Sequence, residues 1–308
     1  MIDTEGLKPR FRLLGPDLSV VSVNWHVWPS CNYRCIFCFA RFDRPDGRLS
    51  FLARDEGLEL ISQLVDSGME KISFVGGEPM LCPYLGDYIR HAKGLGCLTM
   101  VVTNGSLITD EFLKRHEGTI DWIGLSMDSS DESKERTLGR GYGNHLTQLI
   151  SVAKMARRHG IRLKLNVTVT RPVLDEDLHH IIRQIQPDRL KFFQVLRIEG
   201  QNDDSFDDLS VSREEFEAFV NRHRDLDPIA EDNEMMTGSY VMIDPLGRFF
   251  QNTQEKYIFS RPINEIGVMG ALKQVGFSWS KLLRRRGAEY FADGSHESVV
   301  ELGHEEGF

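Results

Sequence analysis

The sequence predicts an α/β protein built on a parallel sheet. Three observations support this prediction. Short apolar segments of strand length alternate with segments of helical periodicity, and glycine or polar residues follow directly after the strands. The chain has 308 residues, 41% of them apolar, enough for one large core. Residues 20–200 contain fewer strand–helix repeats than a closed (β/α) barrel needs, so we expect a partial (β/α)6 barrel with a C-terminal extension.

The barrel elements follow one another in order. The first strand is rich in valine, and the first helix carries Leu58, Ile61 and Leu64 at helical spacing before Gly68 ends it. A later helix places Leu149, Val152 and Ala156 on one face. The predicted strands are 20–27, 71–75, 97–103, 122–127, 162–168 and 190–196, and the predicted helices are 54–66, 84–94, 110–116, 146–159 and 176–184.

The pattern changes after residue 200. Residues 201–208 are polar and acidic, which predicts a loop. A helix over 212–221 should begin with Ser212 as N-cap and Glu215 in a capping box. Strands 239–244 and 248–250 should form a hairpin, and 264–275 a helix. We therefore divide the chain into an N-terminal segment (1–19), the barrel (20–200), the extension (201–293) and a disordered tail (294–308).

Composition excludes several classes of protein. A formal net charge of -9 argues against a general nucleic-acid-binding surface. No apolar run reaches the ~18 residues of a membrane span, so no membrane attachment is expected. The chain has five cysteines, three of them clustered, which do not form a disulfide framework, and Cys82 and Cys97 read as buried free thiols. We expect a cytoplasmic protein.

The most informative motif is the cysteine triplet Cys31, Cys35 and Cys38. Three thiolates suit a [4Fe–4S] cluster whose fourth iron lacks a protein ligand and so stays open to a small molecule. A zinc site would normally show four ligands in two pairs, and no second pair follows. The same spacing could also form one buried helix face.

Polar signals lie at several predicted strand ends. They are the cysteine loop, Gly76-Gly77-Glu78-Pro79, Asn104-Gly105, Ser126 and Asn166. Parallel-sheet proteins bind ligands at the carboxyl ends of their strands. The sequence therefore predicts one composite site at that end of the barrel.

The cysteine triplet, with Phe37 before its last member, fits Cys-x-x-x-Cys-x-aromatic-Cys, and Gly-Gly-Glu-Pro follows the second strand. This pair of motifs resembles the radical S-adenosylmethionine (SAM) family over residues 20–200. The resemblance implies that SAM chelates the open iron and that one electron cleaves SAM to methionine and a 5′-deoxyadenosyl radical. The implied SAM-binding residues are Phe37, Gly76, Gly77, Glu78, Asn104, Ser126, Arg140 and Asn166.

Those SAM-binding assignments have plainer alternatives. Two glycines let the backbone approach a ligand closely, and Glu78 adds an acceptor for a cation, but an isolated Gly-Gly is more often an ordinary turn. Arg140 could pair with the SAM carboxylate, while Ser126 and Asn166 could bind ribose hydroxyls or that carboxylate. Each would otherwise be an ordinary surface polar residue.

A closer resemblance, to the viperin-like enzymes within that family, runs over residues 20–291. It rests on Ser22-Val23-Asn24-Trp25-His26, Gly68-Met69-Glu70-Lys71-Ile72, Asn104-Gly105-Ser106-Leu107-Ile108, Gly139-Arg140-Gly141, Lys164-Leu165-Asn166, Ile198-Glu199-Gly200-Gln201-Asn202, Ser239-Tyr240 and Asp244. The resemblance implies a radical SAM lyase that dehydrates a nucleoside triphosphate to its 3′-deoxy-3′,4′-didehydro analogue, an antiviral RNA chain terminator. CTP is our first choice, with UTP and GTP next. The expected partners are this nucleotide and an electron donor such as flavodoxin or ferredoxin, with the chain itself a monomer.

A triphosphate needs clustered cations, which an acidic chain offers at few places. The candidates are Lys71, Lys164, Arg189, Lys191, and Arg285 or Arg286 in the basic run over residues 281–286. Arg189 and Lys191 share a strand face, and two inward cations need an anion. The basic run could instead be a solvated helix end. Asn24 is a candidate for ribose or base contact, and Tyr240 is either the late hydrogen donor or a packed strand aromatic.

Two departures from the family pattern bear on the base. Residues 73–75 read Ser-Phe-Val, where the animal enzymes have Asn-Phe-Ser, and residues 252–261 also diverge. One alternative is a radical SAM enzyme acting on a peptide or another small molecule. Peptide modifiers commonly carry further C-terminal cysteines, and none follows Cys97 here. The other alternative is a non-enzymatic module in which the cysteines hold a structural metal.

Overall fold

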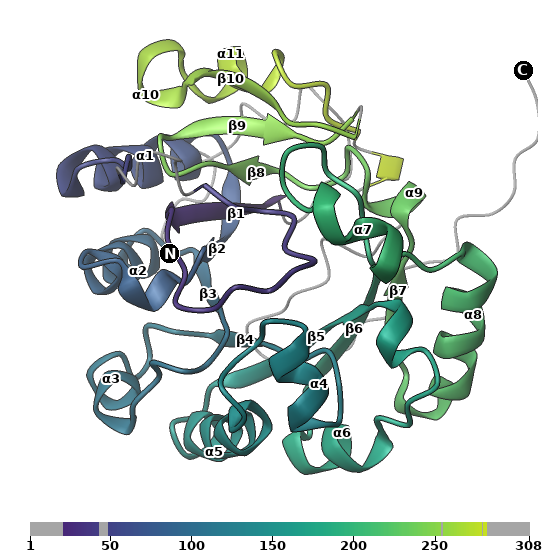
Figure 1. Ribbon diagram of the computed structural model, residues 1–308. Helices are drawn as coiled ribbons and strands as arrows, with labels where there is room; N and C mark the ends of the chain where they lie inside the picture. Colours follow the sequence, from purple (N-terminus) through teal and green to yellow (C-terminus); the bar gives the residue numbers. More distant parts are fainter. Residues whose placement is uncertain (1–20, 43–48, 254, 279, 282–308) are drawn as a thin grey trace, which may run out of the picture.

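The strands form one continuous curved sheet. The structure, a computed structural model, describes residues 21–42, 49–253, 255–278 and 280–281. Its sheet has ten strands in the order β10-β9-β8-β1-β2-β3-β4-β5-β6-β7, and the two end strands do not pair with each other. The strands curve around a shared interior, as Figure 1 shows along the barrel. The expected partial barrel is therefore confirmed.

Parallel pairing runs from β8 through β1 to β7. All six predicted barrel strands are present. The strands are β1 (Val21–Trp28), β2 (Met69–Gly76), β3 (Leu98–Thr103), β4 (Trp122–Ser126), β5 (Arg162–Val169), β6 (Arg189–Gln194), β7 (Ile229–Glu231), β8 (Met242–Ile243), β9 (Arg248–Gln251) and β10 (Ile258–Pro262).

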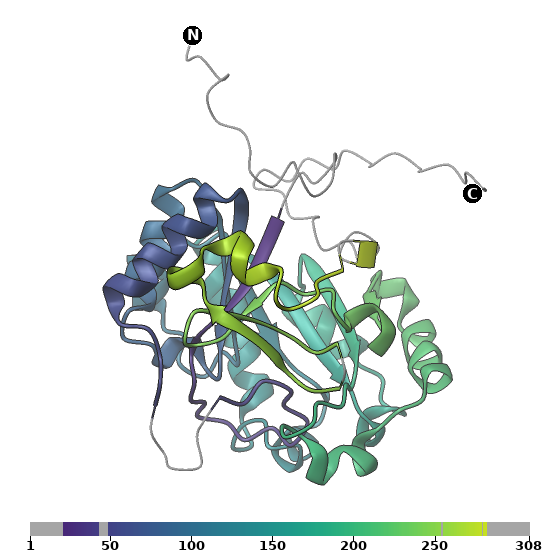
Figure 2. The ribbon, with the colours of Figure 1, turned by 90° about the horizontal axis from the view of Figure 1, so that it is seen from above.

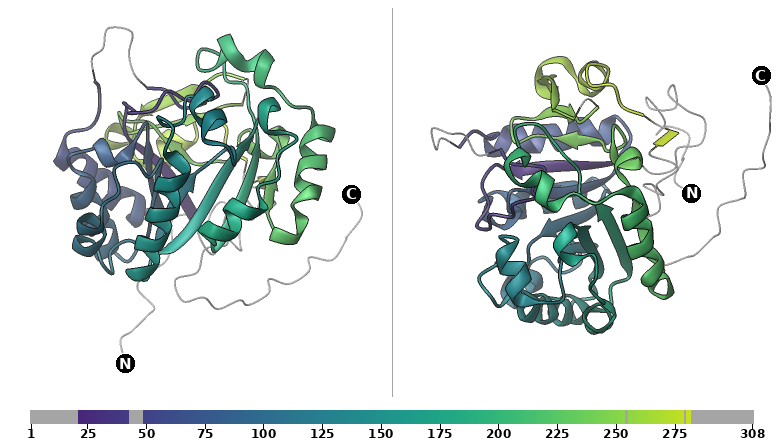
Figure 3. Two further views of the ribbon diagram at one scale, coloured as in Figure 1. Left: turned by 60° about the horizontal axis from the view of Figure 1, so that its bottom comes forward. Right: turned by 45° about the vertical axis from the view of Figure 1, so that its right-hand side comes forward.

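Helices cover the outer face of this sheet, which Figures 2 and 3 show from three further sides. The α-helices in the described part of the chain are α1 (Arg54–Asp66), α2 (Leu85–Gly94), α3 (Asp110–Arg115), α4 (Glu132–Thr137), α5 (His145–Arg158), α6 (His179–Ile185), α7 (Asp203–Leu209), α8 (Arg213–Arg222), α9 (Asn233–Met236), α10 (Ile263–Ile266) and α11 (Val268–Leu272). Of these, α7 packs against the cysteine loop rather than on the outer face. Among these described helices, none is long and apolar enough to cross a membrane. In α8 the predicted capping box is present, because the Glu215 amide donates to the Ser212 hydroxyl at 3.2 Å.

The main core lies between the sheet and its helices. Strand residues alternate between two faces. In β1, Val23, Trp25 and Val27 are buried in the core, while Asn24 and His26 turn to the barrel interior. Pairing of β1 with β2 puts Asn24 beside Ser73, so inward residues of neighbouring strands lie side by side. Helix packing therefore fixes which side chains face the interior.

The prediction of a loop over 201–208 was wrong, because α7 begins at Asp203. Phe206 and Leu209 of this helix pack against a cluster that contains Phe37. The Ser205 hydroxyl also donates to the Ile36 carbonyl at 2.7 Å. These contacts with the cysteine loop outweigh the polar composition on which the loop prediction rested, because tertiary packing overrides local propensity.

The C-terminal extension adds strands to the barrel sheet. The predicted hairpin is confirmed as β8 and β9, and β8 pairs in parallel with β1 through Met242 and Asn24. The predicted helix over 264–275 is divided into α10 and α11, because Gly267 between them has a φ of 73°. Strands β7 and β10 were not predicted. The extension therefore supplies both walls at the open side of the barrel.

Candidate active site

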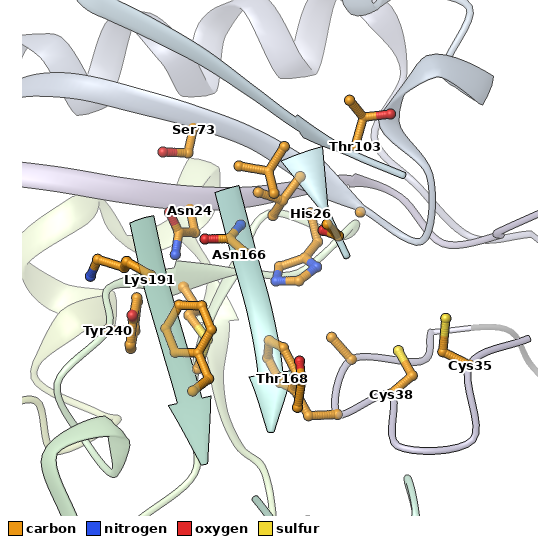
Figure 4. Close-up of a pocket in the computed structure, with 18 of the residues that line it drawn as sticks. Asn24, His26, Cys35, Cys38, Ser73, Thr103, Asn166, Thr168, Lys191 and Tyr240 are labelled. Atoms are coloured by element: carbon orange, nitrogen blue, oxygen red, sulfur yellow. The ribbon is translucent and has the colours of Figure 1, made fainter. Parts of the chain in front are cut away.

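A cavity of about 300 Å³ occupies the barrel interior and brings most of the predicted site residues together. In Figure 4, Cys35 and Cys38 lie at one end and Lys191 and Tyr240 at the other, with Asn166 and Thr168 between them. Predicted residues that line it are Asn24, Cys31, Cys35, Phe37, Cys38, Lys71, Gly76, Gly77, Asn104, Ser126, Arg140, Lys164, Asn166, Lys191 and Tyr240.

The cysteine end is held by backbone hydrogen bonds. The Arg34 amide donates to the Gly139 carbonyl at 3.1 Å, and the Ile36 amide donates to the Leu138 carbonyl at 3.0 Å. A Cβ on Gly139 would lie 2.1 Å from the Arg34 carbonyl oxygen, and the φ of this residue is +80°, so only glycine fits there. This contact sets the cysteine loop against the segment that carries Arg140.

The three cysteines fit the group that the sequence predicts. All three are free thiols, only partly buried, and all line the same cavity. A donor set made only of thiols from one loop suits an iron–sulfur cluster with one iron left open to the cavity. The structure therefore agrees with Cys31, Cys35 and Cys38 as ligands of a [4Fe–4S] cluster.

The Gly76-Gly77-Glu78 segment was expected to face a ligand, but its closest contacts are with other parts of the chain. Gly76 and Gly77 line the cavity, but a Cβ on Gly77 would lie 2.2 Å from the Ser30 carbonyl oxygen. The close approach thus involves the chain preceding Cys31. Glu78 does not line the cavity; its carboxylate accepts from the Thr103 hydroxyl at 2.6 Å and the Asn104 amide at 2.9 Å. This carboxylate therefore anchors the end of β3, and its assignment to SAM binding stays a prediction.

Arg140 is positioned by acidic neighbours. Its Nε donates to the Asp128 carboxylate, and Glu135 lies 3.8 Å away. Burial acts to lower the pKa of Arg140, but the neighbouring Asp128, Cys35 and Glu135 outweigh it. The net effect raises the pKa above its ordinary value, so the guanidinium stays charged. It also lies 5.4 Å from the Phe37 ring centroid. A fixed cation beside the cysteine loop suits an anionic group such as the SAM carboxylate.

The middle of the cavity presents hydrogen-bonding side chains from several strands. Asn24 and His26 come from β1, and Asn166 and Thr168 from β5. Burial lowers the pKa of His26 to about 3, so the imidazole is neutral at physiological pH. Neutral amides, hydroxyls and an imidazole suit a polyhydroxyl ligand such as a ribose.

The far end of the cavity is basic. Lys71, Lys164 and Lys191 are all buried and line it. The ammonium groups of Lys164 and Lys191 lie 5.9 and 5.8 Å from the centre of the Phe193 ring. Lys191 forms an ion pair with Glu231, and Glu231 also accepts a hydrogen bond from the Tyr240 hydroxyl. The sequence predicted that an anion would balance the charge of Lys191. Glu231 provides part of that negative charge.

Three predicted residues, Arg189, Arg285 and Arg286, are not among the described residues that line the cavity. Arg189 pairs in register with Lys164 but is not among the cavity-lining residues. Arg285 and Arg286 lie outside the described residues. Cavity-lining residues not predicted as site residues include His26, Ser73, Thr168 and Phe193. Each lies two positions after a predicted residue on the same strand, so strand alternation could have found them.

Comparison with known proteins identifies the family and the fold. The sequence model of the Radical SAM superfamily matches residues 25–185. The solved structure of anSMEcpe with bound AdoMet and Cp18Cys peptide has a TM-score of 0.60, with 12% identity, covering 86% of this chain and 80% of that chain. Streptococcus suis SuiB bound to S-adenosylmethionine has a TM-score of 0.59, with 16% identity, covering 75% of this chain and 59% of that chain. At these identities the likeness shows a shared fold.

Sequence relatives are more similar. A protein named S-adenosylmethionine-dependent nucleotide dehydratase from Flammeovirga pacifica is 40% identical over 90% of this chain and 98% of its own length. A relative of the same name from Thermoplasmatales archaeon (strain ISO4-H5) is 43% identical over 74% of this chain and 82% of its own. The corresponding protein RSAD2 of Oncorhynchus mykiss is 32% identical over 87% of this chain and 80% of its own. The chain belongs to the radical SAM superfamily and, within it, to the viperin-like S-adenosylmethionine-dependent nucleotide dehydratases.

Proposed function

We propose that this protein dehydrates a nucleoside triphosphate, CTP as first choice, to its 3′-deoxy-3′,4′-didehydro analogue. One observation carries the proposal: a cysteine loop and three buried lysines, Lys71, Lys164 and Lys191, line opposite ends of one cavity. A ligand bound at the lysine end would be anionic there, and the part of it beyond the anionic group would face the cysteine loop. A nucleotide whose ribose faces the cysteine loop meets this description.

Cys31, Cys35 and Cys38 would hold the cluster, which together with SAM would supply the radical chemistry for removal of the ribose 4′ hydrogen. The residues of the chain then have distinct tasks. Arg140, fixed by Asp128, orients the SAM carboxylate. Lys164 and Lys191 bind the phosphates by charge-assisted hydrogen bonds. They thereby hold the 4′ position toward the cysteine end.

The rest of the reaction balances as a dehydration. The 3′ hydroxyl takes up a proton and leaves as water, and one electron then completes the 3′,4′ double bond. We assign Tyr240 as the late hydrogen donor, which gives its hydrogen as the proton that leaves with the 3′ hydroxyl while the electron comes from the external reductant, because its side chain lines the cavity near Lys191. Met100, Val102 and Phe193 supply apolar wall between the polar groups, which limits water access to the reacting carbon atoms.

The nucleobase preference should depend on the cavity-lining residues that differ from the family pattern. Ser73, Val75 and Asn252 all line the cavity. These positions fall in the two segments where the chain differs from the animal enzymes. We keep CTP as first choice, with UTP and GTP next, and expect Ser73 and Asn252 to influence the preference.

The source of the electron is a small donor protein such as flavodoxin or ferredoxin, in the reducing cytoplasm. The product is an antiviral chain terminator.

The test is a panel of the four nucleoside triphosphates with the anaerobically reconstituted protein, SAM and dithionite. Mass spectrometry follows 5′-deoxyadenosine and a nucleotide product lighter by one water. We expect one triphosphate to accelerate SAM cleavage and to give that product. No stimulation by CTP, UTP, GTP or ATP would contradict the proposal and would favour another small molecule or a peptide as substrate. A colourless protein after reconstitution would instead favour a structural metal module.

A further inference from the structure

Glu231 is a buried carboxylate with no role in the chemistry above. It ends β7, and its exposed fraction is 0%. Phe193 of β6 is its register partner, so the side chain lies beside the basic end of the cavity. An ionised group removed from water needs partners to offset its desolvation. Those partners show what this carboxylate does.

The two oxygen atoms of Glu231 have different partners. Oε1 accepts from the Lys191 ammonium, and Oε2 accepts from the Tyr240 hydroxyl. Lys191 is itself buried, with a side chain only 2% exposed. The carboxylate therefore joins the proposed phosphate-binding lysine to the proposed hydrogen donor.

The contacts among Lys191, Glu231 and Tyr240 also cross the seam of the barrel, the gap between β7 and the β8–β9 hairpin, which are not paired in the sheet. Strands β7 and β8 are not hydrogen-bonded neighbours in the sheet. Glu231 lies on β7, and Tyr240 lies two residues before β8. The Tyr240 carbonyl also accepts a hydrogen bond from the side-chain amide of Gln251 in β9. The backbone of Tyr240 is thus held by the hairpin, and its hydroxyl is held across the seam by Glu231.

We propose that Glu231 is a positioning residue, whose carboxylate fixes the Tyr240 hydroxyl and the Lys191 ammonium relative to each other and so sets the ribose opposite Tyr240. The inference rests on the proposed function, because it needs a substrate with both phosphate and ribose. Glu231 itself does not touch the substrate. It is not among the residues that line the cavity, so it acts through Lys191 and Tyr240.

The substitution Glu231→Gln tests this role because glutamine has nearly the same shape. A carboxylate offers two acceptor oxygen atoms, whereas an amide offers one and adds two donors. Gln can therefore accept from Lys191 or from Tyr240, but not from both. It also removes one negative charge from the basic end. The variant should lose the orientation of Tyr240 without losing affinity for a triphosphate.

Two readouts separate positioning from general damage. Nucleotide product per 5′-deoxyadenosine should fall at least about tenfold, the size expected when a hydrogen bond to a charged group is lost. The dissociation constant of CTP on the reconstituted protein without reductant, measured by anaerobic calorimetry, should stay within about threefold of wild type or decrease, because a repulsive charge is gone. Glu234→Gln, the same change on an exposed side chain of α9, should leave both values unchanged.

Two further variants complete the test. Glu231→Asp keeps the charge that Lys191 needs but is too short to reach both partners, so it should show the same loss of coupling if Glu231→Gln does not fold. In Tyr240→Phe, adding Glu231→Gln should cause little further loss, because both changes break one contact. A wild-type product ratio in either Glu231 variant, losses that multiply in the double variant, or a CTP dissociation constant raised more than about tenfold would overturn the role. Absence of product from the wild-type protein would instead refute the proposed function.

Discussion

The two ends of the cavity are built in different ways. At the cysteine end, one continuous loop supplies all three thiols, and backbone hydrogen bonds to the Leu138 and Gly139 carbonyls hold it. At the basic end, Lys71, Lys164 and Lys191 come singly from β2, β5 and β6. A continuous loop leaves a motif in the sequence, whereas single residues from separate strands do not. The chemistry that forms the radical is thus easier to read than the substrate that receives it.

The largest expected effect breaks the cysteine end outright. Cys35→Ala should abolish 5′-deoxyadenosine formation, because two thiols cannot hold the cluster that cleaves SAM. Product analysis by mass spectrometry, with iron content measured beside it, checks this outcome. Cys82→Ala removes a buried thiol that does not line the cavity and should keep full activity. SAM cleavage by the Cys35 variant would remove the basis for the cluster assignment.

The next effect tests whether backbone contact builds that end. Gly77→Ala would place a Cβ 2.2 Å from the Ser30 carbonyl oxygen, so the cysteine loop must shift. We expect loss of most of the iron after reconstitution and a lower melting temperature. Gly94→Ala, at the end of α2 with no atom within 4 Å of the new Cβ, should keep its iron and gain up to about 1 kcal/mol of stability. Equal iron content in both variants would show that the loop does not depend on this contact.

A smaller effect is expected at the basic end. Lys164→Met should lower kcat/KM for the nucleoside triphosphate by about 10- to 100-fold, since one charge-assisted hydrogen bond to phosphate is lost among several. SAM cleavage without nucleotide should be unchanged, because Lys164 lies near the amino end of β5, whereas the cysteine loop follows the carboxyl end of the parallel strand β1. Lys154→Met, on the exposed face of α5, is the matched control. An unaltered kcat/KM in the Lys164 variant would remove that lysine from the phosphate site.

The smallest effect concerns the wall between the two ends. Burial lowers the pKa of His26 to about 3, below the ordinary 6.5 that the unfolded chain retains. Between these values the unfolded state binds the extra proton. Stability should therefore fall as pH decreases from 6.5, by about 1 kcal/mol over the first pH unit for this imidazole. Urea unfolding at pH 6.5 and 5.5 measures the slope, which His26→Gln should reduce and exposed His180→Gln should not. Identical slopes in both variants would contradict a buried neutral His26.

The same contrast explains which parts of the fold and of the site could be predicted from the sequence. Alternating strands and helices predict the six barrel strands, and the cysteine spacing predicts one end of the site. Glu231 escaped prediction because it ends a three-residue strand in a polar segment and belongs to no motif. Helix α7 was missed because its stability depends on packing against Phe37, more than 160 residues earlier in the chain. Contacts of this kind depend on the fold and leave no local signal.

One measurement tests most directly whether both ends serve one substrate. The reconstituted protein is supplied with SAM, dithionite and the triphosphate from the panel that stimulates SAM cleavage most, deuterated at the ribose 4′ carbon. If the radical formed at the cysteine end meets the ribose held from the basic end, the 5′-deoxyadenosine will carry one deuterium and the nucleotide will lose one molecule of water. Unlabelled 5′-deoxyadenosine together with intact nucleotide would contradict the account.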